Sequence, residues 1–331
     1  MTLMQKFLGA AATAALTAGV AAADPAVIFD LGGKFDKSFN EAVYKNGVMK
    51  FKDDMGVKVR EFEPQNEAQM EQGLRRLAQR GHSPIIAIGF TFASAVEKVA
   101  KEFPDQQFAI IDMVVDQPNV QSIVFKEHEG SFLVGVLAAM KSSSGKVGFI
   151  GGMDIPLIRK FACGFAQGAK YANPNATVVQ NMTGTTPAAW NDPVKGSELT
   201  KAQISQGADV VYAAAGGTGV GVLQTAADEG ILSIGVDSNQ NHLHPGKVLT
   251  SMLKRVDVAV YEAMKAGTDL ETGVFTMGLA EEGVGYALDD NNAPLVSGDM
   301  QSAVDEARAK IISGDISVAS YYENDSCPAL S

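Results

Sequence analysis

The chain has 331 residues, and its 38 Asp and Glu against 27 Lys and Arg give a formal net charge of −11. An acidic chain of this kind argues against nucleic acid or an anionic membrane surface as a partner. Its hydrophobic content of 46%, regularly interrupted by Gly and Pro, excludes a disordered protein, and its length allows two domains.

Residues 1–23 have the three parts of a secretory signal peptide. Lys6 supplies a positive charge, residues 7–20 are small and apolar, and the run Ala21-Ala22-Ala23 precedes the expected cleavage before Asp24. The apolar run is short for a membrane span. No Cys lies near the cleavage point, where a lipid-anchored protein would carry one. We therefore expect an exported, soluble protein.

From residue 25, apolar runs of strand length alternate with amphipathic segments of helix length. The expected strands are residues 25–31, 57–63, 84–90, 107–112 and 122–125. The expected helices are residues 38–54, 67–80 and 93–102. Short strands separated by helices are typical of βαβ units and a parallel sheet.

The same alternation restarts at residue 129. The expected helices are residues 129–141, 156–171, 193–206, 219–229, 256–265 and 300–313. The expected strands are residues 145–152, 176–182, 208–216, 231–237 and 247–253, followed by a β-like region at 274–288. Two runs of about four βα units, without a Pro- or Ser-rich linker, predict two doubly wound α/β lobes facing each other.

In such sheets, ligands bind beyond the carboxyl ends of the strands, and these ends carry a consistent chemistry. Carboxylates, amides, aromatics and glycines gather there: Asp36, Asp112, Asp237; Asn40, Asn191, Asn239, Asn241; Phe35, Phe39, Phe90, Phe92, Trp190; Gly216, Gly217. Aromatic faces suit a flat ring, and carboxylates suit hydroxyl or ring N–H donors. Glycines let the backbone approach a ligand. A flat ring joined to a polyol is a nucleoside.

Each of these residues also has a purely structural interpretation. Asp36 could cap the helix that starts at residue 38. Phe39 could belong to the core, Asp112 and Asp237 could be turn formers, and Lys254 could be an ordinary surface charge. The pattern as a whole therefore carries more weight than any single member.

Other chemistries have weaker support. The run "AAAGGTGVG" before a helix imitates a dinucleotide fingerprint, but the third glycine falls on Val222 or Gln224. The "HLH" of residues 242–244 has no third ligand type beside it, so we expect no metal. No nucleophile elbow or Cys–His arrangement predicts catalysis, and no cofactor is implied. Whether Cys163 and Cys327 pair stays open, with a buried residue and a free tail thiol as the simpler interpretation.

Several long segments resemble one family. The segments "DLGGKFDKSFNEA", "VFKEHEGSFLVGVLAA", "GKVGFIGGMDIPLIRKFACGFAQGAKY", "AAAGGTGVGV", "GVDSNQN" and "VLTSMLKRVDVAVY" look like the basic membrane protein family of substrate-binding proteins, which includes purine nucleoside receptors. The resemblance covers residues 26–315. It implies a type I periplasmic binding-protein fold, with two Rossmann-like lobes joined by three crossovers, a ligand in the cleft and delivery to an ABC importer.

The resemblance also implies a ligand set. Two aromatics sandwich the base, here Phe39 (rather than its neighbour Phe35) and Trp190. Base contacts match Asp36, Asn40 and Asp112, and ribose contacts match Asp237, Lys254 and the backbone of Gly216 and Gly217. Phe90 joins this set as a strand-end aromatic. The sequence departs from the family by Trp190 in place of Phe, by His128 in place of Asn and by the missing lipid-attachment Cys.

These observations lead to one main expectation. The protein is a periplasmic, monomeric binding protein without catalytic residues that takes up a nucleoside, guanosine or inosine first, for the permease of an ABC importer. We expect one lobe from residues 24–125 and about 252–285, and the other from residues 126–251 and about 286–331. A same-fold protein for another small polar ligand, or an exported nucleoside-processing enzyme, are the alternatives.

Overall fold

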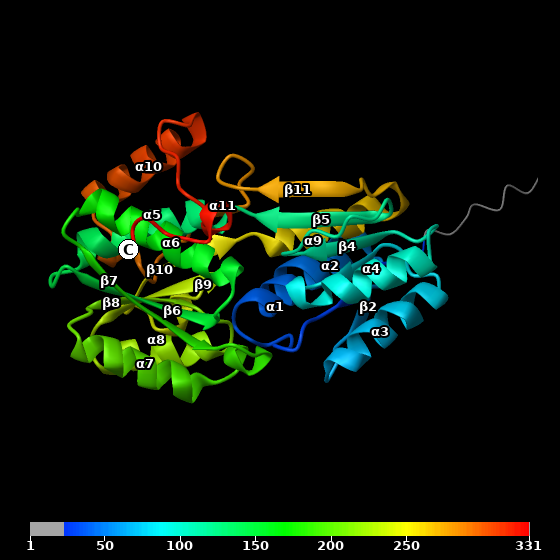
Figure 1. The fold of residues 1–331 in the computed structure, drawn as a ribbon, viewed down its shortest axis with the longest axis horizontal. Coiled ribbons are helices and arrows are strands. Elements are labelled where there is room, and N and C mark those ends of the chain that lie inside the picture. Colours follow the sequence, from blue (N-terminus) through cyan, green and yellow to red (C-terminus); the bar gives the residue numbers. More distant parts are fainter. Residues whose placement is uncertain (1–22, 331) are drawn as a thin grey trace, which may run out of the picture.

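The computed structural model describes residues 23–330 and consists of two α/β lobes arranged along its long axis (Figure 1). This confirms the predicted type of fold, two lobes built on largely parallel sheets. The predicted signal peptide falls outside the described residues except for Ala23.

The N-terminal lobe is built on a six-stranded parallel sheet in the order β11-β5-β4-β3-β1-β2. Its strands are β1 (Ala26–Ile28), β2 (Arg60–Phe62), β3 (Ile85–Ala87), β4 (Phe108–Ile111), β5 (Val120–Phe125) and β11 (Gly273–Met277). The central strands β1, β3 and β4 are completely buried, because helices cover both faces of the sheet. Such strands read as continuous apolar runs, which is why the sequence predicts them well.

The C-terminal lobe has a second six-stranded sheet, in the order β12-β10-β9-β8-β6-β7. Its strands are β6 (Lys146–Met153), β7 (Thr177–Gly184), β8 (Val210–Ala214), β9 (Leu232–Asp237), β10 (Val248–Lys254) and β12 (Val284–Tyr286). Only β12 runs antiparallel to its neighbour, at the edge of the sheet. The two lobes therefore repeat one architecture.

Helices connect the strands. The α-helices are α1 (Phe39–Ala42), α2 (Lys50–Met55), α3 (Glu67–Gln79), α4 (Ala93–Glu102), α5 (Glu127–Lys141), α6 (Pro156–Ala172), α7 (Pro193–Ser205), α8 (Thr218–Asp228), α9 (Val256–Ala266), α10 (Gly298–Ser313) and α11 (Tyr321–Asn324). Short 3₁₀ turns are η2 (Phe90–Phe92), η3 (Pro187–Trp190), η4 (Asn241–Leu243), η5 (Gly267–Asp269) and η6 (Ala293–Leu295). The predicted helix at residues 38–54 is divided by a π-helical segment, η1 (Val43–Met49), which packs on α9.

The chain passes between the lobes three times. It leaves the first sheet after Phe125, returns to the N-terminal lobe after Lys254, and crosses again between β11 and β12. The region predicted as β-like is thus divided, with β11 in the first sheet and β12 in the second. These three crossovers form the hinge between the lobes.

The last residues form a strap over α6. Gln167 in α6 exchanges two hydrogen bonds with the backbone of Ala319, and Cys163 forms a disulfide with Cys327. The interpretation of the cysteines as unpaired is therefore wrong, since the strap brings Cys327 back to the buried Cys163 across 164 residues of sequence.

Candidate ligand-binding cleft

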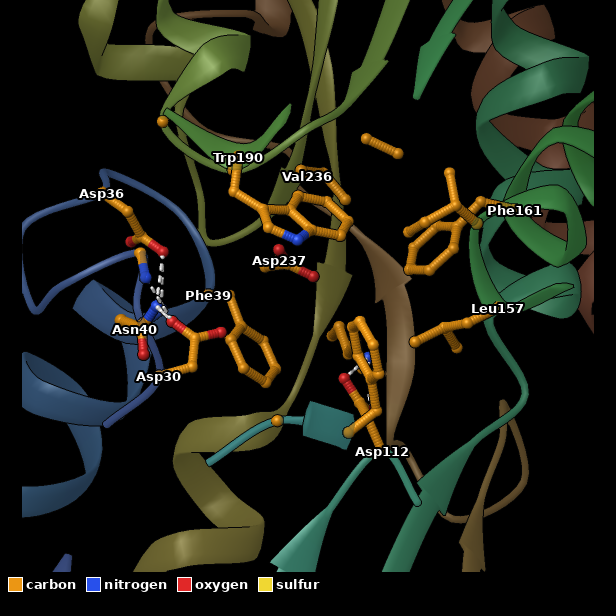
Figure 2. Close-up of a pocket in the computed structure, with 18 residues that line it drawn as sticks. Asp30, Asp36, Phe39, Asn40, Asp112, Leu157, Phe161, Trp190, Val236 and Asp237 are labelled. Carbon is orange, nitrogen blue, oxygen red and sulfur yellow. Dashed lines mark hydrogen bonds and ion pairs between the residues drawn. The ribbon is translucent and has the colours of Figure 1, made fainter. Parts of the chain in front are cut away.

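A cavity lies between the lobes at the carboxyl ends of their strands and contains about 600 Å³ of space between atoms, part of it open to solvent (Figure 2). All ten residues predicted from the sequence line it: Asp36, Phe39, Asn40, Phe90, Asp112, Trp190, Gly216, Gly217, Asp237 and Lys254. The lining also includes residues that the prediction did not name: Asp30, Gly32, Gly89, Leu157, Ile158, Phe161, Ala214 and Val236. Both lobes thus contribute to one site.

The carboxylate of Asp36 is already hydrogen-bonded within the protein. Its two oxygens accept hydrogen bonds from the backbone N–H groups of Ser38, Asn40 and Glu41 at 2.9–3.0 Å, and from the side chain of Asn40 at 3.0 Å. These four donors use the usual capacity of a carboxylate. Asp36 therefore has the structural role of capping helix α1, although it also lies in the cavity wall.

Asp30 is the acid with an open oxygen at this strand end. Its Oδ1 accepts hydrogen bonds from Gly32 N at 2.8 Å and from Asn40 Nδ2 at 2.7 Å, and none of residues 23–330 donates to its Oδ2. Within the same part of the chain, the buried Oδ1 of Asn40 has no partner either. An unpaired buried oxygen costs about 1–3 kcal/mol, which a ligand donor would recover. Asp30 lies two residues after β1, a position that the prediction did not single out.

Trp190 is held in the cavity by the loop between β7 and α7. The carbonyl of Ala189 accepts hydrogen bonds from Thr183 Oγ1 at 3.0 Å and Thr218 Oγ1 at 2.8 Å. A Cβ at Gly152 would come within 2.1 Å of Trp190 Cζ3, so the indole packs directly on the glycine backbone. A glycine is needed there because any side chain would displace the ring.

The aromatic side chains come from different elements. Figure 2 shows Phe39, Trp190 and Phe161 directed toward the same space, with Asp237 beside the indole. Phe39 belongs to α1 of the N-terminal lobe, Trp190 to η3 and Phe161 to α6 of the C-terminal lobe. Closing the lobes would therefore bring aromatic faces onto a flat ligand from both sides.

Two aspartates occupy equivalent places in the two lobes. Asp112 follows β4 with φ 70°, and Asp237 ends β9 with φ 63°. Both therefore adopt the left-handed backbone region, which Asp tolerates better than most residues but which is uncommon outside glycine. Asp112 lies at a bend and Asp237 still belongs to β9, and the side chains of both line the cavity.

Lys254 is a buried cation and not a surface charge. Its Nζ contacts Asp112 Oδ1 at 2.6 Å and Oδ2 at 2.7 Å, and only 2% of its side chain is exposed. It also lies 5.3 Å from the ring centre of Phe39. Burial acts to lower the pKa of Lys254, but Asp112, Glu127 and Asp237 together raise this pKa above its usual value. The lysine therefore stays charged.

Two other carboxylates of the cavity, those of Asp237 and Asp30, hold protons more readily than usual. Burial raises the pKa of Asp237 to about 7 and that of Asp30 to about 6. Asp237 accepts a hydrogen bond from Ser38 Oγ at 2.8 Å, which joins the two lobes. A cavity with these acids and one lysine suits ligands that donate N–H and O–H groups and disfavours anions.

Gly216 and Gly217 bring backbone close to the aromatic wall. Gly216 has φ 54°, and Gly217 is the N-cap of α8. A Cβ at Gly217 would lie 3.2 Å from the carbonyl oxygen of Trp190, which is tighter than ordinary contact, whereas a Cβ at Gly216 would lie 3.5 Å from the same oxygen. They leave the start of α8 accessible to a ligand's polar group.

Residues 23–330 lack two further features. No three His, Cys, Asp or Glu side chains lie together as a metal ion requires. Within the same residues, no helix is both long and apolar enough to cross a bilayer.

Comparisons with known proteins agree on one relationship. Residues 23–321 match the model of the Bmp family, described as ABC transporter substrate-binding protein PnrA-like. The "CD4+ T-cell-stimulating antigen" of Listeria monocytogenes is 35% identical to this chain, and the aligned region covers 88% of this chain and 87% of the antigen. "Basic membrane protein A" of Borreliella burgdorferi is 30% identical to this chain, and the aligned region covers 91% of this chain and 89% of that protein.

The fold has a match among solved structures. An ABC transporter solute-binding protein from Aeropyrum pernix K1 superimposes with a TM-score of 0.82 at 30% identity, and the match covers 92% of this chain and 95% of that one. The likeness therefore extends over both lobes.

Proposed function

Because the chain belongs to the Bmp family of PnrA-like ABC transporter substrate-binding proteins, we propose that it captures a nucleoside, with guanosine or inosine as the first choice, and delivers it to the permease of an ABC importer. In this proposal the protein is exported, works as a soluble monomer in the periplasm and performs no chemistry on its ligand.

The composition of the cavity wall is the observation that carries this proposal. Phe39 and Trp190 approach from opposite lobes and offer faces for a base. Stacking on an aromatic side chain contributes about 1–3 kcal/mol per base. Carboxylate oxygens lie around these rings, and each hydrogen bond to a charged group adds roughly 1.5–3 kcal/mol. After the losses of ordering and closure, a Kd near or below about 1 μM is within reach.

We assign the polar groups by what they accept and donate. Asp30, Asn40 and Asp112 would receive the N–H groups of a 6-oxo purine and select it over adenosine. Asp237 would accept from the ribose hydroxyls, with Lys254 and the Gly216–Gly217 backbone in support. Asp36 would act mainly by holding α1, because its carboxylate is already fully bonded.

The charges of the wall argue for a nucleoside over a nucleotide. Lys254 is the one Lys or Arg among the described residues that line the cavity, and Asp112 and Glu127 already neutralise it. A phosphate would meet four aspartates and no free cation. We therefore expect guanosine monophosphate to bind at least a hundredfold more weakly than guanosine.

Mass spectrometry of the ligand released from purified protein tests the proposal, followed by calorimetry with guanosine, inosine, adenosine, guanosine monophosphate and ribose. A purine nucleoside in the spectrum and sub-micromolar to low-micromolar nucleoside binding would support it. A released sugar or amide, with no nucleoside binding, would contradict it in favour of another small polar ligand. Free hypoxanthine appearing during incubation with inosine would instead indicate a nucleoside-processing enzyme.

A further inference from the structure

Four charged side chains form a buried row at the hinge. Asp112 pairs with Lys254 at 2.6 Å, Lys254 pairs with Glu127 Oε1 at 3.0 Å, and Glu127 Oε2 pairs with Lys160. Between 0% and 8% of each of these side chains is exposed. Two carboxylates and two ammonium groups balance, so the row is neutral as a whole.

The row lies beside two of the crossovers between the lobes. Glu127 is the first residue of α5, directly after the crossover from β5, and Lys254 ends β10, directly before the crossover to α9. Lys160, in α6, also donates a hydrogen bond to the carbonyl of Phe125 at 2.8 Å. Glu127 therefore ties the first crossover to the second.

Glu127 remains charged in this position. Burial acts to raise its pKa, but Lys160 and Lys254 together hold this pKa below its usual range. A completely buried carboxylate without those partners would be strongly unfavourable, so the two lysines and Glu127 depend on one another.

Only one end of the row faces the ligand cavity. Asp112 and Lys254 line the cavity, whereas Glu127 and Lys160 do not. Lys254 Nζ lies 5.3 Å from the ring centre of Phe39 and 5.6 Å from that of Phe161, between aromatics of the two lobes. The carboxylate of Glu127 holds Lys254 on the side away from the cavity.

We propose that Glu127 is a positioning residue for the cleft, which fixes Lys254 against Asp112 and so couples the hinge to the ligand site without touching the ligand. This inference rests on the proposed function for its effect on binding. The position of the Lys254 ammonium group, in contrast, can be measured without any ligand.

The test compares two variants that differ only at residue 127. Glu127→Gln alone leaves Lys160 as an unpaired buried cation and risks misfolding. Lys160→Met serves as the reference because it keeps Glu127 paired with Lys254, and the double variant Lys160→Met/Glu127→Gln removes the carboxylate in that background. Glu129→Gln is the control, since Glu129 lies on the same helix and accepts from Leu279 N in the third crossover but does not contact Lys254.

Two measurements decide the outcome. Calorimetry with guanosine should show the double variant binding at least tenfold more weakly than Lys160→Met, and Glu129→Gln binding within twofold of the unmodified chain. In spectra of ¹⁵N-lysine-labelled, ligand-free protein, the Lys254 ammonium protons should exchange with water at least tenfold faster in the double variant than in Lys160→Met.

Equal exchange rates in the two variants would overturn the proposal, and so would equal guanosine affinities in variants that fold. If the unmodified chain bound neither guanosine nor inosine, the proposed function would fail, and the exchange rates alone would then decide whether Glu127 positions Lys254.

Discussion

Trp190 is the single tryptophan in the chain, and its ring lies in the cavity wall on Gly152. Its emission therefore reports on the cleft without interference from another indole. We expect a saturable change in emission on adding guanosine and little change with ribose, which has no face to stack. Trp190→Ala should weaken binding by roughly 1–3 kcal/mol, and Trp190→Phe by much less, because phenylalanine keeps an aromatic face.

Calorimetry in parallel with fluorescence provides the control for this prediction. If guanosine binds at saturation and the emission keeps its intensity and wavelength, Trp190 does not stack on the base. The same conclusion would follow if Trp190→Ala and Trp190→Phe bound guanosine equally well.

Asp237 makes stability depend on pH. Its pKa is raised by burial to about 7, whereas an unfolded Asp titrates near 3.9. Between about pH 4 and 7 the folded state therefore holds a proton that the unfolded state has lost, so this group's contribution to the free energy of unfolding falls as the pH rises. Asp237→Asn removes that dependence, so its stability relative to the unmodified chain should increase from pH 4 to pH 7.

Denaturant titrations of the ligand-free protein at several pH values measure this difference. Asp105→Asn, at an exposed position of the N-terminal lobe, is the control and should show a constant difference. A constant difference for Asp237→Asn as well would mean that Asp237 does not keep its proton in the folded state.

At the scale of elements, the loop between β1 and α1 connects the lobes. Ser38 Oγ donates to Asp237 Oδ2 at 2.8 Å, Ser238 Oγ donates to the carbonyl of Ser38 at 2.6 Å, and Gln240 Nε2 donates to the carbonyl of Lys37 at 2.8 Å. These bonds join residues about 200 positions apart in sequence and hold one side of the cleft closed. The structure thus has the lobes in contact beside the cavity.

Ser38→Ala removes one of these bonds and leaves Asp237 without its donor. A bond of this kind contributes about 1 kcal/mol, so we expect guanosine affinity to fall about fivefold and the ligand-free protein to be more open. Small-angle scattering should show a larger radius of gyration for the variant than for Ser205→Ala, an exposed serine of α7. Identical radii and affinities in the two variants would mean that the contact does not help close the cleft.

The sequence predicts which segments form strands and helices better than it predicts which residues those segments contact. Buried parallel strands are continuous apolar runs, so most were found, whereas nothing in residues 43–49 predicts a π-helix. Asp30 was not singled out because a lone acid after a strand has the same appearance as a turn former, and its bond to Asn40 exists only in the folded chain. Leu157 and Phe161 look like core residues of α6, although the first two turns of a helix that follows a strand lie near the ligand end of the sheet.

For the molecule as a whole, the sequence indicates two lobes with a cavity between them, but not the long-range contacts within and between the lobes. Glu127 pairs with lysines 33 and 127 residues further on, and this requires α5, α6 and β10 of the C-terminal lobe to be packed together. Similarly, the closeness of Cys163 and Cys327 depends on the strap returning to α6. Such long-range contacts leave no local pattern to detect.

The disulfide should contribute mainly to stability. In the chain-entropy description, closing a loop of this length lowers the entropy of the unfolded chain and so raises the free energy of the unfolded state by about 5 kcal/mol. The double variant Cys163→Ala/Cys327→Ala should therefore unfold at lower urea concentration, while its guanosine affinity stays within twofold because none of the described strap residues lines the cavity. Urea titration and calorimetry on one preparation measure both. Unchanged unfolding, or a tenfold loss of affinity, would contradict this assignment.

The disulfide also fixes an order of events during biosynthesis. Cys163 emerges 164 residues before its partner, after all of the first sheet except β11 and before most of the second. At about 5–20 residues per second, its thiol waits roughly 10–30 seconds for Cys327. During that time the growing chain holds no other cysteine, so a wrong bond can form only with another molecule. The covalent link can therefore form only after every strand of both sheets has been synthesised.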